Sequence, residues 1–513
     1  MKSFVLPGLL FTLLTLFVLP LAADEKKPPE SSPGVVIVTH DKSLFGPDPS
    51  YAEKPYDPEA QLIIYGGKTK VKTARPLLEL GRRLYWDGPI REPGTVMGHK
   101  NPNDFWFYAF GDWRTAVGYN NKANNGKEFG RLATKLNLDF DLKLTSTERI
   151  HAFLTPLDKD GQFTRVDFGT DVQDSDLEWE DDAVLDTLYF EGDFGPIFAG
   201  FSGKDNALDL PFSFGLVPIF TQNGVWAEDA VTGFMITPLS AKNSPKLNIS
   251  NYDVTFFAAF DRISTAAFKK AFSKANEAFN RSSEDTTKMY GVFGFAEANR
   301  GYWEWGYGYL DSDFDGGDYH NVTISHTRRI RHKLSNSVRV IANLGQEGLF
   351  NPDTNRVEKT ANGVLLLIEN SLITSKPSTL VPYFNIFAGF DHPQALVRAA
   401  GAGGVLKNTG LNFEGEAITA LANLDANANN TAGAAIGVEY LFNLDMQLVI
   451  EGAFVIPYGD ENDRIVKENQ FGIDVRYQIP VTNAWIFRFD IFKAFLQDQE
   501  DTAGVRVEIR RKF

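Results

Sequence analysis

Apolar and polar residues alternate strictly along much of the chain. From Leu132 to Leu144 every second residue is Leu, Phe or Thr, and the residues between them are mostly charged or polar. This run exceeds a typical soluble strand of about 5–6 residues and covers the roughly 9–11 residues that a tilted strand needs to cross a bilayer. Period-two alternation leaves a helix without a coherent apolar face. The pattern therefore predicts a membrane-spanning β-strand.

The same alternation recurs to the end of the chain. Every second connection is short, such as 145–148 and 481–483, and most of those between are long and polar, such as 159–182 and 392–431. Short turns at one end and long loops at the other are typical of outer-membrane barrels. We therefore predict an all-β fold, a transmembrane antiparallel β-barrel of about 18 strands over residues 104–513. The strands are expected to begin near Asp104, Gly130, Arg149, Ala183, Ile197, Ala230, Tyr252, Lys288, Tyr302, Tyr319, Ser337, Gly363, Leu380, Ala432, Met446, Asn469, Ala484 and Gly504.

The N-terminal residues indicate export. A basic start, an apolar run over 4–21 and the small residues Ala22 and Ala23 predict a signal peptide over 1–23. Residues 24–103 are rich in proline and charge, which predicts a partly extended periplasmic segment before the barrel.

The C-terminal residues are equally characteristic. Apolar residues alternate with charged ones from Val505 up to the terminal Phe513. A soluble protein avoids leaving such an apolar edge exposed. The ending is typical of the strand that the outer-membrane barrel-assembly machinery reads, so that machinery is a predicted partner through Phe513.

Two segments resemble a known family. The stretches Tyr108–Arg114 and Leu136–Leu142 resemble alginate-export-type outer-membrane proteins, as does the count of eighteen strands. The resemblance covers about the first third of the barrel and implies the fold and a role as a diffusion channel. The arginine cluster that lines that family's pore has no position-by-position match here, so the polysaccharide substrate is not carried over.

Composition and charge narrow the classes of partner. The absence of cysteine excludes disulfides, thiolate metal sites, a lipidated cysteine and covalently attached c-type haem. Lys and Arg number 51 against 66 Asp and Glu, a net charge of −15 that disfavours nucleic-acid binding. For the acidic segment 158–182, a solvated charged loop is the default expectation, and bridging by divalent cations to lipopolysaccharide is the alternative. Outer-membrane lipid is the expected surroundings of the barrel. Nothing in the sequence indicates an oligomeric state.

Charged residues that the alternation points inward form two predicted pore-lining groups. In a closed barrel the first and last strands pair, so basic residues near both chain ends form one wall opposite an acidic arc. Such walls would set a transverse field across the lumen. Alternatively, neighbouring carboxylates such as Asp490 and Glu508 neutralise the basic wall. The basic group is Arg114, Lys135, Arg476, Arg488 and Arg506, and the acidic group is Glu304, Glu369, Asp391, Glu439 and Glu451.

Two further segments suggest special roles. Leu208–Trp226 is strongly apolar where a long outer loop is expected, so it either constricts the lumen, pairs with a neighbouring protomer or is a strand missed in the count. Asp311, Asp313 and Asp315 resemble the start of a calcium loop, although Val322 replaces the expected bidentate glutamate. They predict weak calcium binding, with an ordinary acidic turn as the alternative.

The sequence favours transport over catalysis. The seven histidines have no metal-ligand spacing, and neither G-x-S-x-G nor H-E-x-x-H is present. Barrels of 16–18 strands leave an aqueous lumen. We therefore predict that the protein is not an enzyme but a porin, a channel for passive or weakly selective diffusion of small hydrophilic solutes. The alternatives are an exporter or receptor for a polysaccharide-like polymer and an outer-membrane hydrolase.

Overall fold

The computed structural model describes residues 74–513 except 82–83, 85–91, 123–126, 160–161, 170–175, 182, 270–286, 352–354, 378, 399–402, 416–417, 443–445, 460–465 and 498. The predicted signal peptide lies outside the described residues, as does most of the predicted periplasmic segment. All described residues belong to one compact unit.

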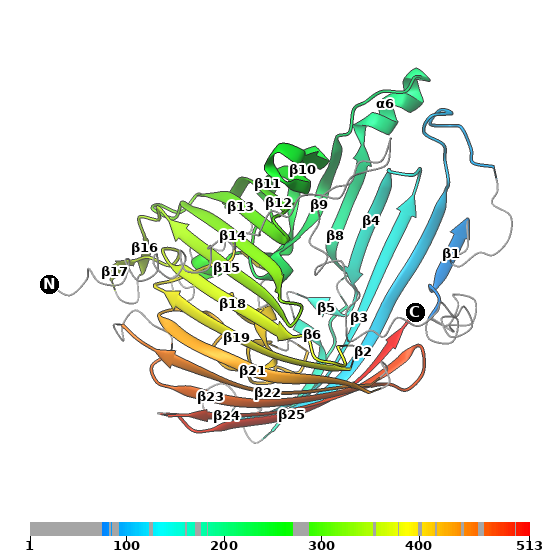
Figure 1. The fold of residues 1–513 in the computed structure, drawn as a ribbon. Helices are drawn as coiled ribbons and strands as arrows, with labels where there is room; N and C mark the ends of the chain where they lie inside the picture. Colours follow the sequence, from blue (N-terminus) through cyan, green and yellow to red (C-terminus); the bar gives the residue numbers. More distant parts are fainter. Residues whose placement is uncertain are drawn as a thin grey trace. The chain divides into compact units, whose positions relative to one another are not determined.

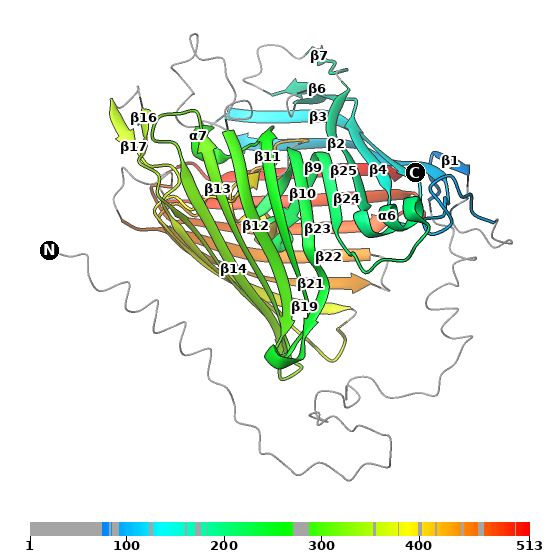
Figure 2. The same ribbon diagram turned by 90° about the horizontal axis from the view of Figure 1, so that it is seen from above.

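Eighteen antiparallel strands form a closed barrel (Figure 1), which confirms the predicted fold. Strands β2 and β25 close it in a continuous register from Asp112↔Lys512 to Asn121↔Ala503. In Figure 2 the green strands β9–β14 cross in front of the orange and red strands β21–β25. The barrel strands are β2 (Trp106–Lys122), β3 (Lys127–Lys143), β4 (Arg149–Thr155), β8 (Val184–Asp193), β9 (Pro211–Thr221), β10 (Ala227–Ser244), β11 (Ile249–Asp261), β12 (Thr287–Ala298), β13 (Gly301–Ser312), β14 (Tyr319–Ile330), β15 (Leu334–Leu344), β18 (Val364–Leu372), β19 (Leu380–Phe390), β21 (Thr431–Phe442), β22 (Met446–Pro457), β23 (Gln470–Pro480), β24 (Trp485–Leu496) and β25 (Thr502–Lys512).

Shorter strands and helices are present besides the eighteen barrel strands. They are the strands β1 (Leu78–Gly81), β5 (Asp158–Lys159), β6 (Gln162–Phe168), β7 (Leu177–Glu178), β16 (Leu349–Asn351), β17 (Arg356–Glu358) and β20 (Val397–Arg398), the α-helices α6 (Phe194–Ser202) and α7 (Ala266–Lys269), and the 3-10 helices η1 (Gln222–Gly224), η2 (Pro245–Leu247), η4 (Lys407–Thr409) and η5 (Leu411–Phe413).

The strands turn apolar side chains outward and polar ones inward. On β22, Ile450 is exposed whereas its neighbour Glu451 is fully buried, and on β25 Val505 is exposed whereas Arg506 is fully buried. Alternation of this kind is what a lipid-facing wall around a polar interior requires. Within the described residues, no helix combines the length and the apolar character needed to cross a bilayer.

The described part of the predicted N-terminal segment contributes to the barrel seam. The last residue, Phe513, exchanges backbone hydrogen bonds with Gly111 (2.9 and 3.0 Å). Where β25 ends, β1 continues along the same edge of β2, in the register Leu78↔Ala109 to Gly81↔Trp106. The segment thus supplies the strand that extends the seam beyond the C-terminus.

One predicted strand is wrong. The strand expected near Ile197 is helix α6, which the Asp193 side chain caps by accepting from the Gly195 backbone N–H and which ends at Gly203 in the left-handed region. The missing strand is β9, which the apolar segment 208–226 forms. Since one element replaces the other, the count of eighteen is unchanged. The end of the barrel that carries α6 and the turns 245–248 and 299–300 is called the turn end below.

Candidate functional site

Two segments fold into the barrel interior. The first is the tip of the β9–β10 hairpin, where Trp226 is fully buried and donates its Nε1–H to Asn321 Oδ1 on β14 (2.7 Å). The second is the connection between β19 and β21, residues 391–430, called the inserted segment. It is joined to the tip because Leu396 donates to the Trp226 carbonyl (2.7 Å) and β20 pairs in parallel with β10.

The inserted segment builds an apolar core inside the barrel. Its described part contributes Leu396, Val397, Leu406, Phe413 and Leu424, all essentially inaccessible to solvent. A connection exposed to water would not carry so many apolar side chains, whereas one that packs against the wall buries them favourably. The wall residues of the same core include Met289, Leu310, Ile341, Leu365, Phe387 and Phe492.

Wall glycines let the inserted residues approach closely. A Cβ added at Gly308 would collide with the Leu396 side chain, and one at Gly472 with Asn412. Gly306 leaves the space that the Trp226 indole occupies. The barrel wall is therefore shaped for the two segments in these positions.

Buried polar groups anchor the inserted segment. The carboxylate of Glu451 accepts from the backbone N–H of Leu411 (3.0 Å) and Asn412 (2.8 Å), from Asn412 Nδ2 (2.9 Å) and from the Tyr383 hydroxyl (2.5 Å). Arg398 donates to the Gly224 carbonyl (2.6 Å). Burial lowers the pKa of the Arg398 guanidinium. These contacts satisfy groups that would otherwise be costly to bury.

Asp425 belongs to the same segment and is also buried. Burial raises the pKa of its carboxyl, and hydrogen bonds from Asn427 oppose that shift. The Asn427 amide donates to Asp425 Oδ1 (2.7 Å), which closes a local turn in the inserted segment.

A cavity of about 600 Å³ lies between the two inserted segments and strands β18–β23. Four carboxylates line it, from Glu228, Glu369, Glu414 and Glu439, and its lining cations are Lys407 and Arg476. The Phe220 ring is also on the lining and is 61% exposed. The remaining polar lining comes from Asn223, Ser371, Tyr383, Asn385, Asn408, Thr409 and Gln447.

The lining charges are mostly paired. Glu414 binds Arg476 (2.7 Å), and Glu228 binds Lys407 (3.4 Å). Glu439 accepts from the neutral Gln447 amide. Within the described part of the chain, no cation lies at ion-pair distance from Glu439, which leaves this carboxylate as the charge best placed to act on a passing ion.

The fourth lining carboxylate is held from behind the cavity. Glu369 receives a hydrogen bond from Arg339 (2.8 Å), whose side chain is buried in the wall. Four of the predicted pore-lining residues thus meet here: Glu369, Glu439 and Arg476 line the cavity, and Glu451 lies behind it as the anchor described above.

The remaining predicted basic residues do not form a free positive wall. Arg114 binds Glu508 (2.8 Å), and the fully buried Arg506 lies between Glu508 and Asp490. Arg488 donates to Gln478 (3.2 Å). The contacts of Arg114 and Arg506 are of the kind that the alternative expectation describes, with neighbouring carboxylates neutralising the wall, whereas the partner of Arg488 is a neutral amide.

Three further predicted pore residues lie apart from the cavity. Lys135 is 4.0 Å from Asp158. Glu304 accepts from the Ser325 hydroxyl (3.1 Å). Asp391 begins the inserted segment in a turn with positive φ (52°), and its N–H donates to Asn430.

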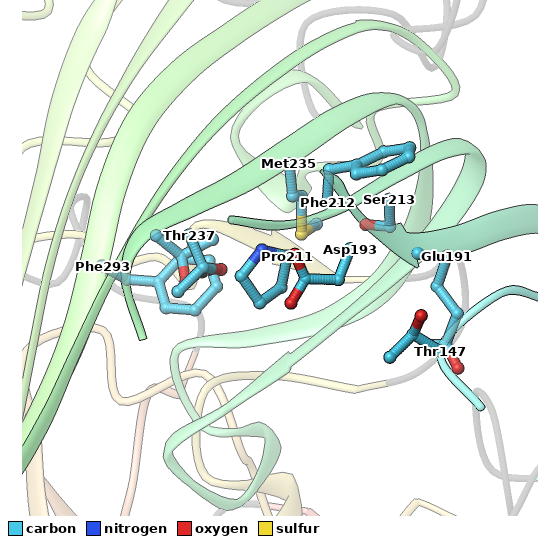
Figure 3. Close-up of a pocket in the computed structure, with 11 residues that line it drawn as sticks. Thr147, Glu191, Asp193, Pro211, Phe212, Ser213, Met235, Thr237 and Phe293 are labelled. Carbon is cyan, nitrogen blue, oxygen red and sulfur yellow. Dashed lines mark hydrogen bonds between the residues drawn. The ribbon is translucent and has the colours of Figure 1, made fainter. Parts of the chain in front are cut away.

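A second cavity, of about 390 Å³, lies on the inner wall at the turn end (Figure 3). Figure 3 shows Asp193, Pro211 and Met235 near its middle, with Thr147 and Glu191 toward one side. Asp193 caps α6 and also accepts from the Leu210 N–H (3.1 Å), so this carboxylate is structural.

The predicted calcium loop forms the β13–β14 connection. There Asp318 accepts from the Ser312 N–H (2.8 Å) and the Tyr309 hydroxyl (2.9 Å). Among the described residues, no three His, Cys, Asp or Glu side chains come together as a metal site. Calcium binding by Asp311, Asp313 and Asp315 stays a prediction.

Sequence reasoning missed the cavity residues that lie on the inserted segments. Glu228, Lys407 and Glu414 belong to stretches expected to be exposed outer loops. A usable signal was present, because the runs Ala395–Val397 and Val405–Leu406 are too apolar for an exposed connection.

No family model matches the sequence, and no curated protein matches it, so the resemblance to alginate-export-type proteins stays a prediction. Solved structures with a similar fold include Pseudomonas aeruginosa OpdQ (TM-score 0.49, 9% identity), P. aeruginosa OpdK with vanillate (0.49, 10%) and Acinetobacter baumannii OccAB4 (0.49, 9%). Each match covers 79% of this chain and 98% of the other. By its own architecture, this chain is a closed antiparallel β-barrel of eighteen strands with segments folded into its lumen.

Proposed function

We propose that the protein is an outer-membrane channel for small hydrophilic solutes and that the 600 Å³ cavity is its selective passage. The observation that carries the proposal is a polar, charge-lined cavity inside a closed barrel whose outer face is apolar. A barrel of this strand number has a lumen too wide to be filled by wall side chains. The inserted segments narrow it to a volume within the range of sites for small molecules, about 300–1,000 Å³.

The charges of the cavity indicate how solutes are selected. Paired charges around a narrow opening select solutes mainly by their polarity and orientation, whereas an unpaired carboxylate also attracts cations. Glu439, which accepts from a neutral amide, is such a carboxylate. Weak selectivity for cationic or neutral polar solutes therefore follows from the geometry.

Transport of a polysaccharide-like polymer is the second candidate, and the alginate-export resemblance of Tyr108–Arg114 and Leu136–Leu142 favours it. A catalytic role is not proposed, since the cavity carboxylates are largely engaged in ion pairs. Lipopolysaccharide around the barrel, and the assembly machinery acting through Phe513, are the partners proposed with either function.

Single-channel recording in a planar bilayer tests the channel. Purified protein should give stepwise currents, and Glu439→Gln should shift reversal potentials in a salt gradient away from cations. The shift should grow at low ionic strength, because the Debye length rises from about 8 Å at physiological salt to about 30 Å at 0.01 M. Glu347→Gln, at an exposed carboxylate on the connection after β15, is the matched control and should leave selectivity unchanged.

Two results would change the assignment. Folded protein that inserts without producing current would overturn the channel. Current that added polysaccharide blocks, but that small sugars and amino acids do not affect, would favour the polymer transporter.

A further inference from the structure

Helix α6 presents one aromatic face at the turn end of the barrel, where Figure 1 places it beyond β8 and β9. Phe194, Phe198 and Phe201 are spaced i, i+4 and i+7, so they share one side of the helix. Phe198 is 53% exposed and Phe201 is 73% exposed. The buried residues of the helix are instead the small Gly195, Ala199 and Gly200.

This face continues the outward apolar surface of the barrel. On β9 and β10, Ser213 and Met235 line the interior cavity, whereas the directly paired Phe214 and Phe234 are not part of its lining and are both exposed on the outer side. Phe214 packs against Phe190 of β8 (5.4 Å between ring centroids).

The aromatic row then passes from the strands onto the helix. Phe190 contacts Phe212 (5.8 Å between ring centroids), which also borders the interior cavity, and Phe212 stacks on Phe194 (4.2 Å). Phe194 in turn stacks on Phe198 (5.9 Å). The exposed aromatic face of α6 is therefore continuous with the wall that faces lipid.

The opposite side of the helix is clamped to the protein. A Cβ at Gly200 would collide with the Met97 carbonyl oxygen, which shows how closely residues 97–101 lie against the helix. Asn101 ties this stretch to the β3–β4 turn by donating to Glu148 (2.7 Å). Lys100 binds Asp205 just beyond the helix (3.0 Å). The helix is thus fixed without the help of Phe198 and Phe201.

We propose that α6 is an interfacial membrane anchor whose Phe198 and Phe201 side chains insert among the lipids at the boundary of headgroups and acyl chains. This inference rests on the proposed function insofar as the barrel must lie in a membrane. Amphipathic helices bind that boundary through an apolar face, and aromatic girdles border the apolar band of transmembrane barrels. Lipid is the occupant because the face is continuous with the lipid-facing wall. The charged residues Lys204 and Asp205, which follow the helix, are exposed and suited to water.

The absence of native cysteine allows a direct test by site-specific labelling. Single-cysteine variants Phe201→Cys, Lys204→Cys and Ile450→Cys would each carry an environment-sensitive fluorophore. They would be reconstituted into phosphatidylcholine vesicles containing phosphatidylcholine spin-labelled either near the headgroup or near the chain end. Lys204 is the exposed control on the same connection, and Ile450 is the control on the lipid-facing wall.

We expect the Phe201 probe to be quenched more by the headgroup-proximal label than by the chain-end label and to be shielded from aqueous iodide. The Lys204 probe should respond to iodide, and the Ile450 probe to spin-labelled lipid. If Ile450 is quenched by lipid but Phe201 responds only to iodide, the anchor is overturned while the membrane barrel stands. A Phe201 probe shielded from both quenchers would overturn lipid as the occupant in favour of protein. Failure of lipid quenching at Ile450 would count against the membrane barrel itself.

Discussion

The carboxylate of Glu451 lies where the inserted segment meets the barrel wall. Its oxygens accept from two consecutive backbone N–H groups, an amide and a hydroxyl, so the 3-10 turn η5 is held by one side chain of β22. Hydrogen bonds to a charged group contribute about 1.5–3 kcal/mol each, and buried donors left unpaired are costly. Sequence alternation predicted that Glu451 faces inward, but three of its four donors come from a connection about 40 residues earlier in the chain.

Replacing Glu451 by Gln should loosen the inserted segment. The Leu411 and Asn412 backbone N–H groups donate to different oxygens of Glu451. Gln keeps only one acceptor oxygen, so its N–H₂ leaves one of these two groups without an acceptor, and the segment should lose about 1–3 kcal/mol of anchoring. Transient increases in single-channel current should appear that are rare in the unmodified protein. Tyr383→Phe removes only one of the donors and should produce a smaller effect.

The matched control is Glu304→Gln, which alters an inward carboxylate of β13 bonded to Ser325. It should leave the current steady. Equal current noise in Glu451→Gln and Glu304→Gln would show that Glu451 does not anchor the segment.

At the scale of whole elements, strands were predictable and connections were not. Alternation with period two identifies a strand because successive side chains face lipid and lumen in turn, whatever residues lie far away in the sequence. The segment 208–226 was harder to interpret, since β9 has its own alternation interrupted by Pro218 and ends in an apolar tip buried in the lumen. Of the alternatives for 208–226, the missed strand is the one that describes residues 211–221, which form β9, while constriction of the lumen by the tip stays a prediction. The inserted segment has no periodicity, and its fold depends on wall residues that are distant in sequence.

Removing the inserted segment should widen the pore without unfolding the barrel. Replacing residues 395–428 by a Gly/Ser linker removes the lining residues Lys407 and Glu414, while the ladder between β19 and β21 remains. Single-channel conductance should rise severalfold and charge selectivity should fall. Shortening the β16–β17 hairpin, which pairs only with itself among the described strands, is the control and should leave conductance unchanged.

Unchanged conductance in a folded 395–428 replacement would mean that the inserted segment does not narrow the passage. Deleting residues 211–224, by contrast, should prevent folding, because it removes β9 and leaves β8 and β10 each with one edge that has no partner strand.

At the scale of the whole molecule, closure is what turns the alternating strands into a barrel. The sequence predicted a barrel from its alternation and from the short turns and long loops between the strands, and the structure supplies the register that closes it. What no periodicity could supply is the continuation of the seam by β1, since four residues in a proline-rich stretch carry too little pattern to be distinguished from an extended linker.

The seam gives a decisive test of the fold. Val117 and Val507 are opposite each other on β2 and β25 and share the outward face. Residues directly opposite in antiparallel strands have Cα atoms about 4.5–5.5 Å apart, which lies within the range of about 4.4–6.8 Å that a disulfide spans. Since the chain contains no other cysteine, Val117→Cys/Val507→Cys should oxidise to a single intramolecular disulfide. The cross-linked chain should migrate differently from its reduced form on boiled, non-reducing gels.

A control pair separates closure from chance contact. Val117→Cys with Ile450→Cys places the second thiol on β22, three strands from β25 along the sheet, where the two residues cannot meet if the barrel is closed as described. This pair should remain reduced under the same oxidant. Because β2 and β25 are nearly 400 residues apart in the chain, efficient cross-linking of the first pair alone requires the barrel to close in this register. Cross-linking of both pairs, or of neither in folded protein, would contradict the seam.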